Sequence, residues 1–249
     1  MTAVQVEERF YRHVMGSPDL ACFQVMEGES DLWVAVDRES WSPGLPDRAR
    51  DLVRRVRRDV ESYIARDSSF LTSLEPVAVA GDAPAIVREM AQAAAHVGVG
   101  PMAAVAGAVA EAVARDLLPH VHEVMVENGG DIFLCSRKPR RVAILAGTSP
   151  FSLRVGLLIP GDGGPMAVCT SAGRWGHSLS LGCADAAVAV AASGALADAG
   201  ATWLGNLVRE VADLSAALEQ ARGLPGLVGV VLVKDSRMAA WGEIQLTPV

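Results

Sequence analysis

The stretch that decides the fold is AVCTSAGRWGHSLSLGCADAAVAVAASGALADAGATWLGN, residues 167–206. It begins as an apolar strand, passes through a Gly- and Ser-rich loop, and continues as a second strand over 186–192. Helices are expected over roughly 195–220. Asp198 and Thr202 lie four residues apart, so on a helix their side chains share one face. A carboxylate and a hydroxyl placed in this way suit Mg²⁺ held beside a substrate phosphate. The alternative is that Asp198 caps the helix and Thr202 bonds back within it.

Working outward, the rest of the chain alternates groups of short strands with helices. Apolar segments at 20–26 and 31–36 flank a turn and predict a β-hairpin. Helices are expected over 46–66, over 83–97 with Asp82 as the cap, and over 102–118. Strands grouped into meanders predict an α+β fold, with mainly antiparallel sheets packed against helices. No linker interrupts the pattern, so residues 1–249 are expected to form a single domain. Further strands are expected at 123–127, 131–135, 141–146, 152–159, 166–170, 228–234 and 238–246.

Composition limits the functions that are compatible with this chain. Of its 249 residues, 51% are apolar, which is enough for a sizeable core. The formal net charge of −7 argues against a nucleic-acid partner. The four cysteines have no zinc-ligand spacing and indicate a reducing compartment. No uncharged apolar run reaches the ~18 residues of a membrane span. We therefore expect a cytoplasmic protein without a membrane partner.

The segment Asn128-Gly129-Gly130-Asp131 is the second polar feature that lies between strands. Asn-Gly is typical of a two-residue hairpin turn, because both positions tolerate positive φ. Glycines also allow backbone N–H groups to approach a phosphate or a flavin ring, with Asp131 as a polar contact. Both interpretations remain open at this point.

A third polar segment, residues 170–178, follows the strand at 166–170. His177 is the best general-base candidate, Asp185 is the second catalytic candidate, and Trp175 could stack on a planar ring. The alternative is an ordinary glycine-rich loop. Small hydroxyl residues before a glycine, together with a guanidinium, can bind phosphate, and here they are Thr170, Ser171, Gly173 and Arg174.

Three of these segments resemble the ApbE-like superfamily of flavin transferases, in the family's order and over about residues 100–206. The strand 187–192 leading into ADAGAT resembles the family's strand and "ADALAT" motif, whose Asp and Thr bind magnesium. Residues 127–132, ENGGDI, resemble the "NlGGdi" stretch near the flavin nucleotide, and residues 170–173 resemble a Ser-Gly element. The similarity is closest to a shorter branch of bacterial and archaeal proteins. It implies Mg²⁺ at Asp198 and Thr202, and FAD or FMN as the cofactor.

The chain departs from the family pattern at two places. In the segment that matches "AKGyavD", Gly107 remains and Glu111 keeps an acid, but Ala106 stands at the lysine position. The nucleotide-contacting "HiiDPrTGyP" segment has no clear counterpart, because Gly164-Pro165 is at most a remnant. The resemblance therefore implies the scaffold of the family, but with these departures it leaves open whether the chain transfers flavin.

The resemblance supports three hypotheses of different classes. The first is an enzyme that binds a flavin nucleotide or related phosphate ester with Mg²⁺, in some form a transferase. The second is a non-catalytic cofactor-binding or carrier protein in anaerobic sulfur assimilation, from sulfide to homocysteine. The thiols of Cys135 and Cys183 distinguish the second hypothesis from the others, because direct sulfur carriage needs a reactive thiol. The third is a homologue that acts through homo-oligomer contacts. The Arg-rich helix 48–58 is either a solvated face or a docking surface for an acidic partner.

Overall fold

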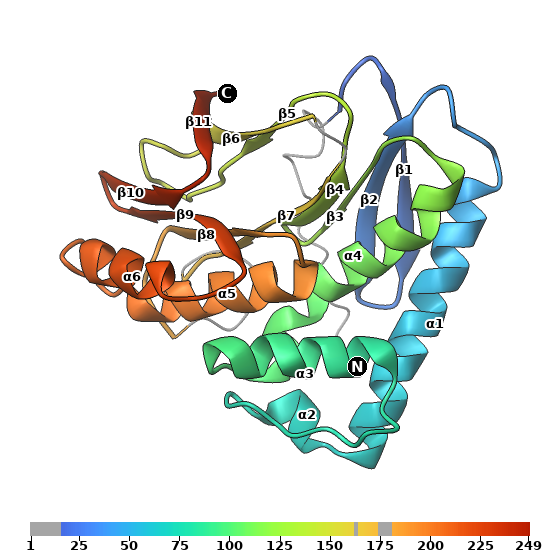
Figure 1. Ribbon diagram of the computed structural model, residues 1–249, viewed down its shortest axis with the longest axis horizontal. Helices are drawn as coiled ribbons and strands as arrows, with labels where there is room; N and C mark the ends of the chain where they lie inside the picture. Colours follow the sequence, from blue (N-terminus) through green and yellow to red (C-terminus); the bar gives the residue numbers. More distant parts are fainter. Residues whose placement is uncertain (1–15, 162–163, 174–180) are drawn as a thin grey trace.

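An eight-stranded antiparallel sheet crosses the whole molecule, and a three-stranded sheet lies on one of its faces (Figure 1). The computed structural model describes residues 16–161, 164–173 and 181–249. The fold is α+β, as the sequence predicts. The large sheet has the order β1 (Leu20–Glu27), β2 (Ser30–Asp37), β3 (Val124–Asn128), β4 (Asp131–Cys135), β7 (Pro165–Ser171), β8 (Ala186–Ala191), β9 (Leu227–Lys234) and β10 (Arg237–Gly242). The small sheet has the order β11 (Gln245–Pro248), β6 (Val155–Ile159) and β5 (Arg140–Ala143).

The helices gather on the other face of the large sheet (Figure 1). Contacts place α1 against β1, α4 against β3 and β4, and α5 against β7 and β8, while α3 packs on α4 and α5. The described helices are α1 (Leu45–Arg66), α2 (Ser69–Thr72), α3 (Ala85–Val97), α4 (Val105–Leu117), α5 (Gly194–Leu207) and α6 (Asp213–Arg222), with 3₁₀ turns at Pro101–Ala104 and Leu118–His120.

Strand β8 illustrates why the sequence forms this layered core. Ala187, Ala189 and Ala191 belong to the helix-side core, whereas Val188 and Val190 belong to the core beneath the small sheet. Successive side chains of a strand point to opposite faces, and here both faces are covered. The continuous apolar run is therefore buried along its whole length.

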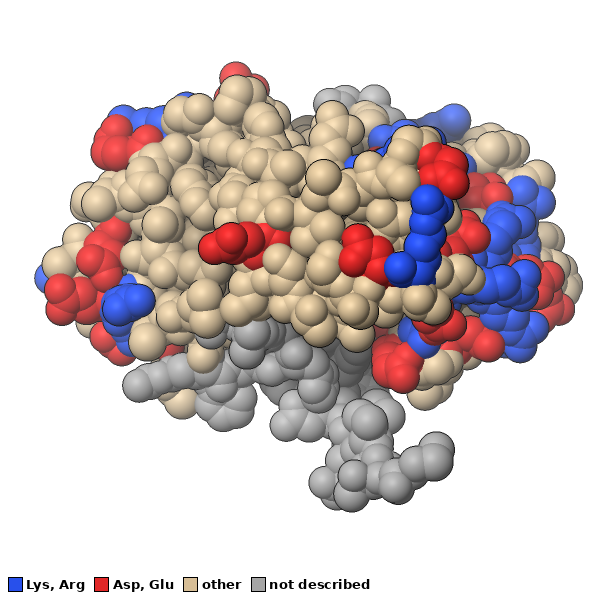
Figure 2. Space-filling view, turned by 90° about the horizontal axis from the view of Figure 1, so that it is seen from below, with Lys and Arg blue, Asp and Glu red and all other residues tan. Residues whose placement is uncertain are grey.

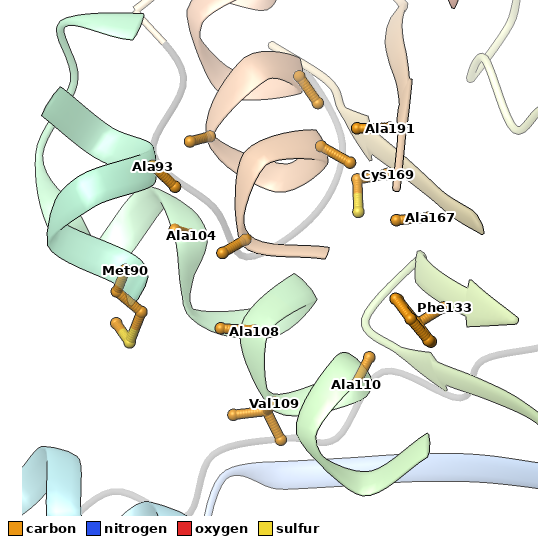
Figure 3. Close-up of a cluster of buried hydrophobic side chains, with 14 of the residues drawn as sticks. Met90, Ala93, Ala104, Ala108, Val109, Ala110, Phe133, Ala167, Cys169 and Ala191 are labelled. Atoms are coloured by element: carbon orange, nitrogen blue, oxygen red, sulfur yellow. The ribbon is translucent and has the colours of Figure 1, made fainter. Parts of the chain in front are cut away.

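Small residues allow α4 and α5 to cross with their backbones in contact. A Cβ atom on Gly107 would lie 2.2 Å from the carbonyl oxygen of Gly194, and one on Gly194 would lie 2.3 Å from that of Gly107. Side chains around this crossing are also small, and Figure 3 shows Ala104, Ala108 and Ala110 along this part of the chain, with Ala110 near Phe133. The Ala- and Gly-rich composition thus brings one helix close to the other.

Two sequence-based expectations about element ends are wrong. Asp82 does not cap α3: Pro84 holds the N-cap position without a side-chain bond, and Asp82 instead accepts hydrogen bonds from Arg66. The expected strand 238–246 is divided, because β10 ends at Gly242 with φ of 108° and β11 pairs with β6 in the small sheet. Positive φ at this glycine lets the chain turn from one sheet to the other.

The Arg-rich helix is α1, and its exposed face is a mixture of both charge signs. Arg48 pairs with Asp116, Arg54 with Glu27, and Arg57 with Glu29 and Glu61. Figure 2 shows basic and acidic side chains interleaved at this end of the molecule. These pairs support the solvated-face interpretation over a docking surface for a polyanion.

Among the described residues, no single helix combines the length and apolarity needed to cross a bilayer. One bent pair of segments, Ala85–Val97 with Pro101–His120, passes the same test jointly, with an angle of 104° between them.

Candidate functional site

The β3–β4 turn positions the first carboxylate of the site. Gly129 and Gly130 have φ of 69° and 102°, and Asn128 pairs with Asp131 across the hairpin. The turn interpretation is therefore correct, because positive φ at both positions favours glycine. Asp131 is buried, and its Oδ1 accepts a hydrogen bond of 3.1 Å from the backbone N–H of Thr170 on β7.

Helix α5 positions the second carboxylate. Asp198 is half-buried in the second turn of the helix, and its Oδ2 accepts a hydrogen bond of 2.9 Å from the backbone N–H of Gly107 on α4. This contact depends on the crossing of the two helices, because a Cβ atom on Gly107 would lie 2.8 Å from the Cβ of Asp198. Thr202 follows one turn later on the same face and is buried.

Asp198 is not a helix cap, so the capping alternative is wrong. Ser193 is the N-cap of α5 and accepts a hydrogen bond from the N–H of Leu196. Glu111 of α4 adds a second constraint, because its Oε2 accepts a hydrogen bond of 2.6 Å from the N–H of Gly194. The retained Gly107 and Glu111 of the sequence motif thus fix the start of α5, which carries Asp198.

The Asp131 and Asp198 carboxyl groups act on each other inside the protein. Burial raises the pKa of Asp131 well above its usual range, and the nearby charge of Asp198 raises it further. Burial also raises the pKa of Asp198 to about 7. Hydrogen bonds from the backbone N–H groups of Gly107 and Ala106 act in the opposite direction and lower it. Among the largest causes of these two pKa shifts, none comes from a basic side chain of the described residues. A cation bound between the two carboxyl groups would therefore favour their ionised forms.

Cys169 hydrogen-bonds the Asp131 side chain and was not singled out by the sequence patterns. Burial raises the pKa of its thiol, and the charges of Asp131 and Asp198 raise it further. Figure 3 shows Cys169 beside Ala167 and Ala191 on the strand face that meets α5. Strand alternation was the available signal, because residues 169 and 171 share one face of β7.

The turn residues on either side of Asp131 have different surroundings. Asn128 donates from Nδ2 to the carbonyl oxygen of Ala106 at 3.2 Å, so the lysine-replacing residue contacts the turn through its backbone. A Cβ atom on Gly130 would meet no atom within 4 Å. The turn therefore presents open space on the side of Gly130, which is compatible with a ligand that lies against its backbone.

The end of β7 carries the remaining described candidates of the third polar segment. Ser171 is buried, and among the described residues its Oγ is the one buried side-chain oxygen or nitrogen without a hydrogen-bond partner. The backbone N–H of Gly173 donates to the carbonyl oxygen of Ala184 at 2.9 Å. Arg174, Trp175 and His177 lie outside the described residues.

Asp185 and the two discriminating cysteines lie elsewhere. The Asp185 carboxylate accepts a hydrogen bond from the N–H of Asp235, whose φ is 53°, and so holds the β9–β10 turn. Cys135 is buried, and Cys183 is exposed. Direct sulfur carriage at Cys135 loses its support because that thiol is not accessible, so only Cys183 among the two is open to a reagent.

The donor set at the Asp131–Asp198 pair fits a hard cation. It consists of two carboxylates, with the Thr202 hydroxyl one helical turn away. Within the described residues, no group of three His, Cys, Asp or Glu side chains could enclose a metal ion. Mg²⁺ commonly binds through one or two carboxylates and completes its shell with water and substrate phosphates. The arrangement is therefore suited to a metal–phosphate complex rather than to a closed protein cage.

Comparison with known proteins identifies the family. The family model described as "AbpE bacteria" matches residues 12–226. A UPF0280 protein of Methanocella arvoryzae is 42% identical over 195 residues, covering 78% of this chain and 79% of the relative. The chain belongs to the ApbE-like UPF0280 family. The UPF0280 protein of Methanocaldococcus jannaschii is 37% identical over 221 residues, covering 87% of this chain and 88% of the relative.

Solved structures similar to this UPF0280 protein share its fold. The flavinyl transferase ApbE of Pseudomonas stutzeri, in its apo form, aligns with a TM-score of 0.61 and 16% identity, covering 89% of this chain and 93% of the other. The flavin transferase ApbE of Vibrio cholerae aligns with a TM-score of 0.56 and 16% identity, covering 89% and 96%. The expected ApbE-like fold is thus confirmed.

Proposed function

We propose that this UPF0280 protein binds a flavin nucleotide, or a related phosphate ester, together with Mg²⁺. The observation that carries the proposal is the convergence of Asp131 and Asp198 from two separate elements, where burial raises both pKa values and the charge of Asp198 raises that of Asp131 further. A bound Mg²⁺ would stabilise the ionised forms of both carboxyl groups and polarise a phosphoryl oxygen. The flavin transferases that share the fold make a flavin nucleotide the first ligand to test.

Each described residue has a defined part in this proposal. Asp131 and Asp198 are the charged ligands of the cation, and Thr202 is the neutral one. The N–H of Gly107 holds Asp198, and that of Thr170 holds Asp131, so both carboxylates are oriented before a ligand arrives. The open space at Gly130 lets the nucleotide lie against the turn, while the Gly130 N–H is already donated to Glu127 Oε1 at 2.8 Å.

Binding without transfer is the function that these residues support best. Ala106 stands where the resembling enzymes have lysine, and its carbonyl oxygen accepts the Asn128 side chain. Transfer would break the pyrophosphate bond of FAD, join the FMN phosphoryl group to an acceptor hydroxyl, and release AMP to solution; without an added acceptor, water would take that place. Release of AMP during incubation with Mg²⁺ and FAD would therefore identify the protein as an enzyme.

The decisive experiment is calorimetric titration of FAD with and without Mg²⁺. Wild-type protein is expected to bind FAD only with Mg²⁺, and Asp198→Asn is expected to weaken that binding by more than about tenfold, because a charged ligand is lost. Asp82→Asn is the matched control, since Asp82 is an exposed carboxylate paired with Arg66. Binding that is independent of Mg²⁺, or unchanged in Asp198→Asn, would overturn the proposal.

A further inference from the structure

Strand β1 forms one edge of the large sheet, and its sequence does not protect that edge (Figure 1). Its eight residues, LACFQVME, pair with β2 without a bulge and include no proline, lysine or arginine. Natural proteins protect open edges with such residues, with bulges or with very short strands, because unpaired N–H and C=O groups attract another strand. The edge of β1 is therefore open to pairing.

The other edge strands of the two sheets are protected in these ways. β11 has four residues and contains Pro248, and β5 has four residues and begins with Arg140 and Arg141. β10 begins with Arg237, and α6 packs against it. The contrast makes β1 the edge strand that is expected to be covered in solution.

The backbone groups of alternate β1 residues point away from β2. Glu27 pairs with Ser30 across the two-residue turn, so the odd-numbered residues of β1 exchange hydrogen bonds with β2. The same alternation continues beyond the strand, where the N–H of Arg38 donates to the carbonyl oxygen of Asp19 at 3.1 Å. Within the described part of the chain, no hydrogen bond from another element occupies the outward groups. These outward N–H and C=O groups belong to Cys22, Gln24 and Met26.

Uncharged side chains flank this open edge on both faces of the sheet. Cys22 and Gln24 are exposed, and Met26 is 54% exposed. Phe23 packs on the helix-side core, so these three side chains lie on the opposite face. The Phe23 ring lies 5.5 Å from that of Trp41, which is 38% exposed. Exposed apolar side chains along an open edge are typical of a protein–protein contact.

The outward groups are symmetric about Gln24, so they fit a second copy of the same strand. In an antiparallel pair across a two-fold axis at Gln24, this residue meets its own counterpart. Cys22 then meets Met26 of the second copy, and every outward N–H and C=O group gains a partner. A second copy therefore satisfies the whole edge with one self-complementary contact.

The charges at the two ends of β1 favour the same register. Asp19 and Glu27 flank an uncharged run. A two-fold axis at Phe23 would place Asp19 directly opposite Glu27 of the second copy, and like charges in that position are destabilising. With the axis at Gln24, Glu27 instead lies opposite Ala21.

We propose that the protein forms a two-fold symmetric dimer in which the β1 strands of two copies pair antiparallel about Gln24. The two large sheets then continue into one another. This proposal does not rest on the proposed function, because β2 and β3 separate β1 from β4, which carries Asp131. Dimer formation and ligand binding are therefore expected to be independent.

The test uses paired charges at the exposed positions of β1 and measures molecular mass by sedimentation equilibrium of the full chain. Wild type is expected to be a dimer. One variant combines Cys22→Lys with Met26→Lys, and the other combines Cys22→Glu with Met26→Glu. Each places like charges opposite one another and is expected to raise the dimer dissociation constant by more than about tenfold. An equimolar mixture is expected to recover the dimer, because opposite charges then face each other.

The matched control combines Leu71→Lys with Leu74→Lys, which adds the same charge at apolar positions that are 50% and 55% exposed. This control is expected to remain a dimer. Gln24→Pro removes an N–H that β2 does not use, and is expected to give a folded monomer, because proline is tolerated on edge strands. Thermal unfolding checks that each variant folds. A monomeric wild type, like-charged variants that remain dimers, or a mixture that stays monomeric would overturn the proposal.

Discussion

At the residue scale, the buried, electrostatically coupled carboxyl groups of Asp131 and Asp198 oppose the stability of the metal-free protein when they are ionised. Burial holds the pKa of Asp198 near 7, so ionising it costs free energy that the unfolded chain does not lose. Asparagine at this position keeps an acceptor for the Gly107 N–H but removes the charge. We expect Asp198→Asn to raise the free energy of unfolding in the presence of a chelator by roughly 1–3 kcal/mol near pH 8.

Urea denaturation of wild type and Asp198→Asn in the presence of a chelator measures the difference in their free energies of unfolding. Excess Mg²⁺ is expected to reduce or reverse this difference, because only wild type keeps both carboxylate ligands for the cation. A variant less stable than wild type without metal would contradict the view that Asp198 is retained at a cost to folding.

At the element scale, the crossing of α4 and α5 determines where Asp198 lies. A Cβ atom on Gly107 would meet the Gly194 carbonyl oxygen at 2.2 Å, so the helices must separate to accept it. We expect Gly107→Ala to lower the free energy of unfolding by about 1–3 kcal/mol and to weaken Mg²⁺-dependent ligand binding. Gly44→Ala is the matched control, because a Cβ atom there meets nothing within 4 Å. Equal stabilities of the two variants in urea would refute a tight crossing.

Element positions followed from the sequence where periodicity and turn residues were strong. The hairpin of β1 and β2, helix α1 and the glycine end of α3 occur where the patterns placed them. Local patterns could not place β11 in a second sheet, since that pairing joins residues 245–248 to 155–158. They also could not bring Gly107 to Asp198, a contact across 91 residues of chain. The family motifs supplied the candidate members of the site; strand alternation could place Cys169 on the helix side, but only tertiary packing brings it to Asp131.

At the scale of the whole molecule, a buried ionic network joins the small sheet to the large one. Arg140, the first residue of β5, donates to both oxygens of Asp19 before β1 and to Glu123 before β3. Arg140 and Glu123 side chains are 9% and 7% exposed. Removing the guanidinium leaves the buried Glu123 carboxylate with the Ser136 hydroxyl but without a cationic partner, so we expect Arg140→Met to cost about 3–5 kcal/mol of unfolding free energy.

Arg66→Met is the control for that variant. It breaks the ion pair of Arg66 and Asp82, whose side chains are 56% and 71% exposed. This variant is expected to lower the free energy of unfolding by at most about 1 kcal/mol. Guanidinium unfolding of both variants checks the comparison, and similar costs would show that the two sheets do not depend on the network.

The same network makes stability depend on pH. Hydrogen bonds from Arg140, Ser17 and Lys138 hold the pKa of Asp19 well below its usual range. A lowered pKa in the folded state contributes stability that is complete above the unfolded pKa, near 3.9, and is lost as the pH falls below it. We expect the stability advantage of wild type over Asp19→Asn to shrink between about pH 5 and pH 3. An advantage that stays constant across this range in urea titrations would contradict the assignment.

The measurement that tests the central claim most directly is anomalous diffraction from crystals grown with FAD and Mn²⁺, a hard cation that replaces Mg²⁺ at oxygen ligands. The account predicts a manganese peak within coordination distance of the Asp131 and Asp198 carboxylates, next to a phosphate of the nucleotide. A flavin bound elsewhere on the molecule, or a crystal with no metal peak between these two carboxylates, would contradict it.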